Sequence, residues 1–329
     1  MSLAIKHNRA MCFALTAALA SYFAATASAQ NYPAKPVRYI VPFPAAASPD
    51  IIARLLTERL SRLWNQQVVV DNRSGAGGTL GAAFAAKSPA DGYTLFQCNS
   101  ASSAIAEALY ARLPYDHQRD FAPISRIGTT PMVLVVHPSI PARSVNEFIA
   151  YAKANPGKLS YGTSAGGTPA QLAMELIKQT TKIDVVHVAY KGGPQALSDV
   201  MGGQIPFTVQ PASLVLPAIQ SARVRALAVL SLKRIPQLPA VPTLHETVLP
   251  GFDVNPWFGV CAPTGTPTPV LDKVHADLNA VLNMPEIQHR FNDLVIEAAP
   301  TSREEFARFI SVETVRWARV IKDAGIAQQ

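Results

Sequence analysis

Short apolar runs of strand character alternate with segments of helical periodicity over most of this 329-residue chain, and this alternation limits the fold more than any other feature. Residues 37–41 form such a run, and within residues 51–63 the apolar side chains repeat at helical spacing. The same order returns at residues 67–71 and 93–97, each followed by a helical segment. Strands alternating with helices predict an α/β fold with mostly parallel sheets, whose ligand-binding loops lie at the carboxyl ends of the strands.

Two longer apolar segments predict crossings between two lobes. Residues 121–137 are too many for one ordinary strand and are interrupted by Gly128 and Pro131. Residues 257–262 form the second such segment. A chain of this size more often divides into two lobes than into one. We therefore expect a first lobe of residues 30–128 plus 256–329 and a second lobe of residues 129–255, joined by two hinge strands.

The first 29 residues have the three parts of a cleaved export signal. Lys6 and Arg9 supply the positive start, residues 10–25 are mostly apolar, and Ala27-Ser28-Ala29 fits the cleavage site. No later segment holds enough unbroken apolar residues to span a bilayer. We expect a mature chain that begins near Gln30 and is located in the periplasm.

Charge and cysteine content exclude several classes of protein. The chain carries 29 Lys and Arg against 22 Asp and Glu, a net charge of +7 with no Lys/Arg block, so we expect no nucleic-acid partner. Three cysteines are too few for a disulfide scaffold, and Cys12 is removed with the signal. Cys98 and Cys261 lie in or after apolar runs. We interpret them as two buried free thiols, with a single bridge as the alternative.

Residues 159–171 have the pattern of a short strand, a glycine-rich turn and a helix start, an arrangement that presents backbone N–H groups to an anion. Thr168 fits the N-cap, Pro169 the first helical position, and Gln171 the partner position of a capping box. The segment also contains the G-x-S-x-G pattern of serine hydrolases around Ser164. It is therefore either one wall of an anion site or the nucleophile turn of an enzyme.

The enzyme alternative has little support in the rest of the chain. A nucleophile turn requires the helix to follow almost at once, whereas Thr168 and Pro169 place the helix start four to five residues after Ser164. Residues 75–78 resemble a phosphate loop but lack the Lys that would follow it, and no metal-ligand spacing occurs. We expect no catalysis, no metal and no cofactor. The histidines downstream of Ser164 have no recognisable partner context; these are His187, His245, His275 and His289.

A series of short motifs spreads along essentially the whole mature chain. It includes Val69-Val70-Asp71-Asn72-Arg73, Asp91-Gly92-Tyr93 and Trp257-Phe258-Gly259. Further members lie at residues 32–43, 113–116, 120–123, 190–192, 202–204, 225–228 and 262–263. In this order the motifs resemble those of the Bug family, the TctC-like solute receptors of tripartite tricarboxylate transporters.

The resemblance implies a periplasmic binding protein of the two-lobed type II fold that closes over a small carboxylate, either a di- or tricarboxylate or an aromatic carboxylate. Backbone amides and ordered water would hold the ligand, and a monomeric receptor would deliver it to two membrane permease subunits. Carried over by position, the ligand-binding residues would be Phe43, Ala46, Ala47, Ser48, Asp50, Asn99, Ser100 and Ser102 in the first lobe, and Ser164, Ala165, Gly166, Gly167, Thr168, Tyr190 and Gln210 in the second.

Two positions depart from the family pattern. The first loop is usually rich in glycine, whereas here it is Ala45-Ala46-Ala47 followed by Ser48. If one of the family glycines has a positive φ, an alanine in its place would cost roughly 1 kcal/mol, and the loop would then tend toward another shape. The family often has an acidic residue where Gln210 stands. A ligand with an amino group is therefore less expected here.

Overall fold

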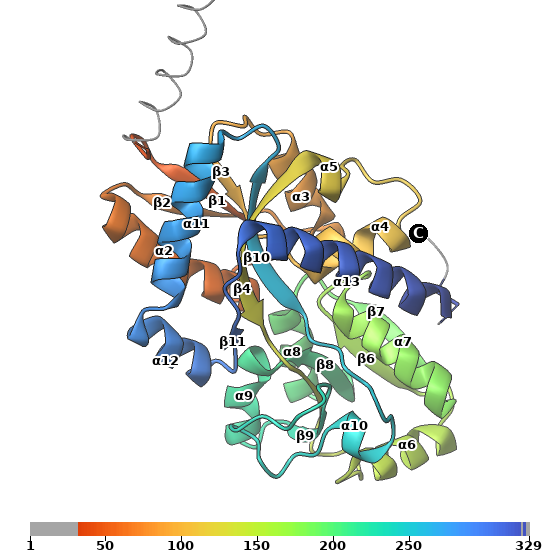
Figure 1. Cartoon of the computed structure of the whole chain (residues 1–329). Coiled ribbons are helices and arrows are strands. Elements are labelled where there is room, and N and C mark those ends of the chain that lie inside the picture. Colours follow the sequence, from red (N-terminus) through yellow and green to blue (C-terminus); the bar gives the residue numbers. More distant parts are fainter. Residues whose placement is uncertain (1–31, 324, 327–329) are drawn as a thin grey trace, which may run out of the picture.

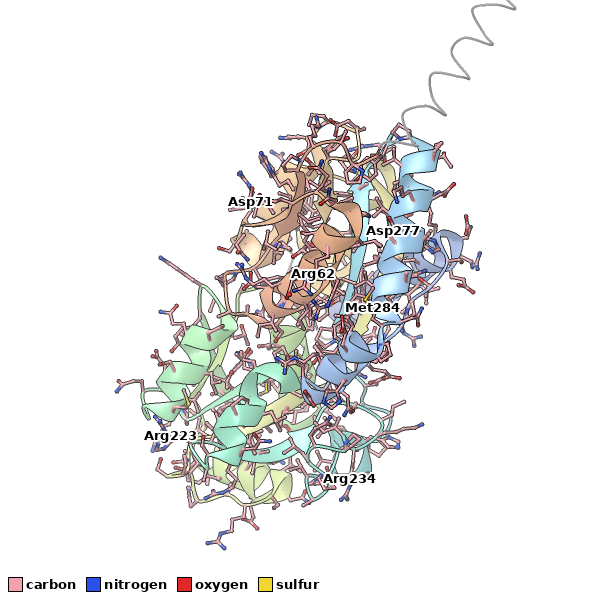
Figure 2. All side chains as sticks on the ribbon, turned by 90° about the vertical axis from the view of Figure 1, so that its left-hand side faces the viewer. Arg62, Asp71, Arg223, Arg234, Asp277 and Met284 are labelled. Carbon is pink, nitrogen blue, oxygen red and sulfur yellow. A yellow bond between two sulfur atoms is a disulfide. The ribbon has the colours of Figure 1, made fainter. Side chains whose placement is uncertain are left out.

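Residues 32–323 and 325–326 are described by a computed structural model, in which the chain forms two lobes (Figure 1). Each lobe has one β-sheet with helices packed against it. Figure 2 shows the two lobes from the side, with Asp71 and Asp277 on one of them and Arg223 and Arg234 on the other. The predicted export signal and its cleavage site lie outside the described residues.

The first lobe is built on six strands: β1 (Val37–Val41), β2 (Val68–Asn72), β3 (Thr94–Phe96), β4 (Phe121–Thr129), β10 (Trp257–Pro263) and β11 (Glu297–Ala298). Their order in the sheet is β11-β4-β10-β3-β1-β2. β1 runs parallel to β2 and to β3, whereas β10 runs antiparallel to β3 and to β4. The strand β11 pairs antiparallel with β4 at the edge.

The second lobe is built on five strands: β5 (Met132–Val136), β6 (Leu159–Thr163), β7 (Val185–Ala189), β8 (Phe207–Pro211) and β9 (Arg225–Val229). Their order is β7-β6-β8-β5-β9. β6 runs parallel to β7 and to β8, and β5 runs antiparallel to β8 and to β9.

Helices cover both sheets (Figure 1). None of the described helices is both long and apolar enough to cross a membrane. The first lobe carries α2 (Ser48–Trp64), a 3-10 turn η1 (Ala76–Gly78), α3 (Thr79–Ala86), a π-turn η2 (Ala101–Ile105), α4 (Ala106–Leu109), α5 (His117–Asp120), α11 (Thr268–Leu282), α12 (Pro285–Asp293) and α13 (Arg303–Asp323). The second lobe carries α6 (Val145–Ala154), α7 (Pro169–Thr181), α8 (Gly193–Met201), α9 (Ala212–Gln220) and α10 (Leu244–Thr247).

Helix α2 shows how the apolar periodicity of the sequence becomes packing. Its Ile52 and Leu56 are fully buried and join one hydrophobic cluster with Tyr39 of β1 and Leu278 of α11. Burying side chains of this size removes enough apolar surface from water to stabilise the fold by roughly 1.5–3 kcal/mol each. This packing fixes α2 on the sheet so that its first residue, Ser48, lies at the edge that faces the other lobe.

The α/β class predicted from the alternation is present, but both sheets are mixed rather than mostly parallel. The antiparallel pairs all involve β4, β5, β9, β10 or β11. Strand β4 leads the chain out of the first sheet and β10 leads it back, so these two neighbours necessarily run in opposite directions. The spacing of apolar residues within one segment carries no information about that return path.

The chain passes from the first sheet to the second between Thr129 and Met132, and it returns at β10. Helix α13, dark blue in Figure 1, also reaches the second lobe. Its Asp323 carbonyl accepts a hydrogen bond of 2.7 Å from Gln179 Nε2 of α7. Its Arg316 guanidinium donates to the Asp253 carbonyl, which precedes β10. The C-terminal helix therefore contacts both lobes and the returning segment.

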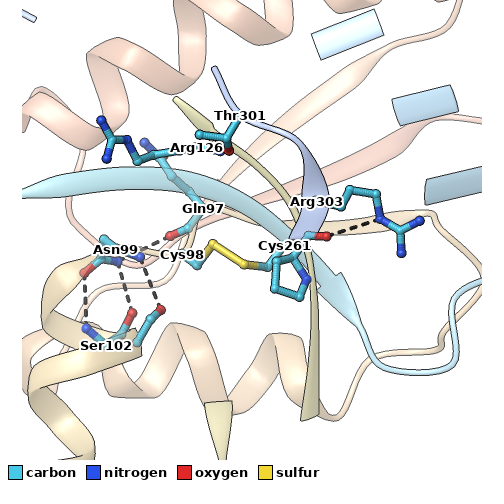
Figure 3. The surroundings of a disulfide bond; sticks show 10 residues. Gln97, Cys98, Asn99, Ser102, Arg126, Cys261, Thr301 and Arg303 are labelled. Atoms are coloured by element: carbon cyan, nitrogen blue, oxygen red, sulfur yellow. Dashed lines mark hydrogen bonds between the residues drawn. A yellow bond between two sulfur atoms is a disulfide. The ribbon is translucent and has the colours of Figure 1, made fainter. Parts of the chain in front are cut away.

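Cys98 and Cys261 are joined by a disulfide bond (Figure 3). Our interpretation of two free thiols was therefore wrong, and the alternative of one bridge is correct. Cys98 lies two residues after the end of β3, and Cys261 lies on β10, which pairs with β3 at Phe96. The two cysteines are 163 residues apart in the sequence but have Cα atoms 5.9 Å apart. Only the pairing of β3 with β10 brings them together.

Candidate ligand-binding site

One cleft between the lobes is lined by residues from both of them. It brings together eight of the residues that the family resemblance implied: Phe43, Ala47, Ser48, Asn99, Ser100, Ser164, Thr168 and Gln210. It also has lining residues that the sequence did not point to, among them Met132, Pro169, Gly193, Leu214, Pro256 and Phe258. Ala46, Asp50, Ser102, Ala165, Gly166, Gly167 and Tyr190 are not part of this lining.

Five helical segments begin at the cleft. The starts of α2, at Ser48, and of η2, at Ala101, line it from the first lobe, and the starts of α7, α8 and α9 line it from the second. The backbone N–H groups of Ser48, at the start of α2, and Ser100, directly before η2, donate no hydrogen bond within the described chain, and neither does that of Ser164 in the turn before α7. Unpaired N–H groups at helix starts carry partial positive charge and favour an anion.

The turn before α7 is held by its own hydrogen bonds. Thr168 is the N-cap residue, as predicted, but its hydroxyl donates to the Ala165 carbonyl at 3.1 Å and does not cap the helix. Gln171 Oε1 accepts from the Gly167 N–H at 2.7 Å, one residue earlier than a capping box requires. The Gly167 amide is therefore already satisfied, and the open amides of this turn belong to its other residues.

The loop before η2 is organised by Asn99 (Figure 3). Its Oδ1 accepts from the N–H groups of Ala101 at 3.0 Å and Ser102 at 3.2 Å, and its Nδ2 donates to Ser102 Oγ at 3.0 Å. The Ser102 carbonyl in turn accepts from the Tyr115 hydroxyl at 2.6 Å. Asn99 and Ser102 thus shape the loop, while the Ser100 hydroxyl has no hydrogen-bond partner among the described residues.

Asp50 stabilises the alanine-rich loop, residues 45–47, that precedes α2. Its carboxylate accepts hydrogen bonds from the Ala46 N–H at 2.9 Å, Arg54 Nε at 3.0 Å and Asn72 Nδ2 at 2.9 Å. Burial alone would raise the pKa of Asp50, but the hydrogen bonds from Arg54, Ala46 and Asn72 outweigh it and lower the pKa. Ala46 has a φ of 62°, so the alanine-rich loop does keep a left-handed residue. Asp50 positions this loop and is not free to contact a ligand.

Tyr190 lies outside the cleft. Its hydroxyl donates to Asp199 Oδ2 at 2.8 Å within the second lobe. Burial and the hydrogen bond to Asp199 raise the pKa of Tyr190 to about 12. The ring packs against the hydrophobic cluster of β5, α8 and α9, so Tyr190 has a structural role.

The two lobes touch at the rim of the cleft. Ser48 Oγ of α2 lies 2.7 Å from Ser213 Oγ of α9. Glycines allow two further approaches: a methyl group added at Gly192 would come within 2.6 Å of Pro44 Cγ, and one added at Gly77 within 2.8 Å of the Gly166 carbonyl oxygen. At these points the two lobes lie in direct contact.

The lining residues supply hydrogen-bond donors and apolar surface but no charge. Among residues 32–323, none that lines the cleft has an ionisable side chain. Ser164 Oγ contacts no base, since the nearby His187 ring instead pairs with Thr163 Oγ1 at 2.7 Å, and α7 begins only at Pro169. No group of three or more His, Cys, Asp or Glu suited to a metal occurs in the described part of the chain. This chemistry fits binding of a small anion with an apolar part.

Comparison with known proteins agrees with this geometry. Residues 52–326 match the model of the tripartite tricarboxylate transporter family receptor, TctC. Protein BugT of Bordetella pertussis is 37% identical over 303 residues, covering 92% of this chain and 93% of BugT. The structure of R. palustris Rpa4515 with adipate superposes with a TM-score of 0.88 at 35% identity, covering 91% of this chain and all of that one. MatC from Rhodopseudomonas palustris with bound malate gives a TM-score of 0.84 at 29% identity, covering 88% of this chain and all of MatC.

The family match covers most of the chain, the relatives align along nearly their full lengths, and the solved structures share the two-lobed fold. The chain belongs to the tripartite tricarboxylate transporter receptor family, the TctC or Bug proteins.

Proposed function

We propose that this protein captures a small carboxylate in the cleft between its lobes and delivers it to the two membrane subunits of a tripartite tricarboxylate transporter. The observation that carries the proposal is the convergence of helix starts from both lobes on a cleft whose described lining has no charged side chain. Partial positive charge at helix starts stabilises a carboxylate without an ion pair. A ligand held from both sides also stabilises the closed arrangement of the lobes.

Family membership supports a binding role. The receptors of this family and the solved structures that resemble this chain are solute-binding proteins and not enzymes. Two of these structures hold dicarboxylates, adipate and malate. The open Ser100 and Ser164 hydroxyls are suited to donating hydrogen bonds to a carboxylate, and no base is placed to activate Ser164.

The site of action and assembly state belong to the same proposal. A receptor that serves a membrane permease must be exported, and the signal features of residues 1–29 are consistent with cleavage before Gln30. We propose that the mature protein acts in the periplasm as a monomer, because both walls of the cleft come from one chain.

A thermal-shift screen tests the proposal directly. The mature protein is heated with mono-, di- and tricarboxylates and with aromatic carboxylates, and with sugars and amines as controls. A carboxylate present at 100 times its Kd stabilises the folded state by about 2.7 kcal/mol, which raises Tm by roughly 5–10 °C. No shift with any carboxylate, together with a shift from an uncharged control compound, would show that the cleft serves another class of ligand.

A further inference from the structure

We propose that Gln210 presents a carbonyl oxygen to the cleft, and that the preferred ligand is therefore a monocarboxylate with an apolar body and one neutral hydrogen-bond donor, such as a hydroxyl group. The inference rests on the proposed carboxylate-receptor function and narrows its ligand class. It follows from a chain of hydrogen bonds that fixes which end of the Gln210 amide faces the cleft.

The chain of hydrogen bonds begins at a backbone carbonyl. Thr208 Oγ1 donates its only proton to the Gly162 carbonyl oxygen at 2.7 Å. It can therefore only accept from its second neighbour, Gln210, whose Nε2 lies 3.0 Å away. A flipped amide would place two acceptor oxygens against each other in a buried site, with no proton between them. Gln210 Nε2 thus points to Thr208, and Oε1 points the other way.

The oxygen of Gln210 lies at the start of α8. A methyl group added at Gly193 would come within 2.6 Å of Gln210 Oε1 and 2.9 Å of Leu214 Cδ2. Gly193, Gln210 and Leu214 all line the cleft. Gln210 is 1% exposed, and its Oε1 accepts no hydrogen bond from the described residues. This helix start, which would otherwise favour an anion, already faces the negative end of an amide dipole.

The unpaired Gln210 Oε1 determines which ligand group can bind beside it. A second carboxylate would bring like partial charges together and would lose water without gaining a donor. An ammonium group finds no carboxylate in the described lining either, and Asp50 and Asp199 are both engaged elsewhere. A hydroxyl or amide N–H gives the Gln210 oxygen the neutral donor that it lacks.

The remaining walls suit an apolar body. Phe43 and Phe258 come from the first lobe, and Met132 and Leu214 come from the second. Phe258 is 4% exposed and Met132 is 2% exposed, so both are fixed by the packing around them. Polyhydroxylated ligands would leave hydroxyl groups unpaired against these side chains. The open N–H groups of Ser48, Ser100 and Ser164, with the Ser100 and Ser164 hydroxyls, remain for one carboxylate.

Calorimetric titration with hexanoate, 6-hydroxyhexanoate and adipate isolates the effect, because the three share a six-carbon chain and differ only at one end. We expect 6-hydroxyhexanoate to bind about three- to tenfold tighter than hexanoate, as one neutral hydrogen bond allows. Adipate should bind at least about tenfold more weakly than 6-hydroxyhexanoate. Tightest binding of adipate, or binding only of carboxylates outside this series, overturns the inference but leaves the receptor function standing. If no carboxylate binds at all, the receptor function falls with it.

Two variants assign the preference to Gln210. Gln210→Met removes the carbonyl while keeping the side-chain length, so the preference for 6-hydroxyhexanoate over hexanoate should fall to within about twofold. Thr208→Val breaks the hydrogen-bond chain, frees the amide to turn, and should reduce the disadvantage of adipate. Gln204→Met, at an exposed position of the same lobe, is the control and should change neither ratio. A preference that survives in both folded cleft variants would contradict the role of Gln210.

Discussion

Gly77 of the first lobe lies against the carbonyl oxygen of Gly166 in the second, so closely that a methyl group at Gly77 would approach this oxygen to 2.8 Å. The contact joins the η1 turn to the turn before α7, beside the cleft. Gly77 has a φ of 63°. This close approach of the two lobes therefore depends on the absence of a side chain at Gly77.

Gly77→Ala should hold the lobes apart. Because the obstacle is backbone and cannot turn away, we expect ligand affinity to fall at least about tenfold and ligand-induced compaction to be lost in small-angle scattering. Gly251→Ala is the matched control, since Gly251 has a φ of 82° but nothing within 4 Å of an added methyl group. Equal loss of affinity in both variants would assign the effect to backbone strain and not to closure.

Ala46→Gly should stabilise the protein. Ala46 has a φ of 62°, a conformation that costs an alanine about 1 kcal/mol and glycine little. We expect the free energy of unfolding to rise by up to about 1 kcal/mol in urea titration. Ala45→Gly, in the same loop at a residue without positive φ, should be neutral or destabilising. Destabilisation by Ala46→Gly would mean that the loop adopts another shape in solution.

His117 should make the protein sensitive to mild acid. Its ring is buried, stacks on Phe121 with centroids 4.9 Å apart, and has both nitrogens unpaired within the described chain. Burial lowers the pKa of His117 to about 3. Below pH 6.5 the unfolded chain binds a proton that the folded chain does not, so stability falls by about 1.4 kcal/mol per pH unit toward pH 3. His117→Phe should flatten this part of the stability profile, and parallel profiles for both proteins would contradict the assignment.

Thiol titration of the denatured protein tests export and the disulfide together. Cys98 and Cys261 are bonded, and Cys12 lies in the predicted signal. Protein isolated from the periplasm should therefore show no reactive thiol before reduction and two after it. Cys261→Ser should show one. One thiol in the unreduced wild-type protein would indicate a retained signal, and two would indicate that the bridge does not form.

Local sequence signals predicted the elements well, because strand and helix starts depend on neighbouring residues. The strand Val37–Val41 and the start of α7 at Pro169 lie where apolar spacing and cap residues placed them. Family resemblance pointed to Ser100 and Ser164, which do line the cleft. The lobe boundaries and the ligand contacts themselves stay predictions.

What the sequence missed depends on contacts between distant segments. Met132 and Phe258 line the cleft because they lie where the chain crosses between the sheets. From their apolar spacing alone, such residues are predicted only to belong to the hydrophobic core. The hydrogen bond that occupies the Gly167 N–H depends on the orientation of the Gln171 side chain, and residue spacing does not determine that orientation. The helix start at Pro194, of the same kind as Thr168-Pro169, was predicted from the sequence, but its place at the cleft was not.

The most direct measurement compares the best carboxylate of the screen with its own primary amide by calorimetric titration. The two have the same shape, but only the carboxylate carries the charge that the helix starts of both lobes would hold. Two or more hydrogen bonds to a charged group predict at least about a 100-fold weaker Kd for the amide. Equal affinity for the two compounds would contradict the claim that the cleft recognises an anion.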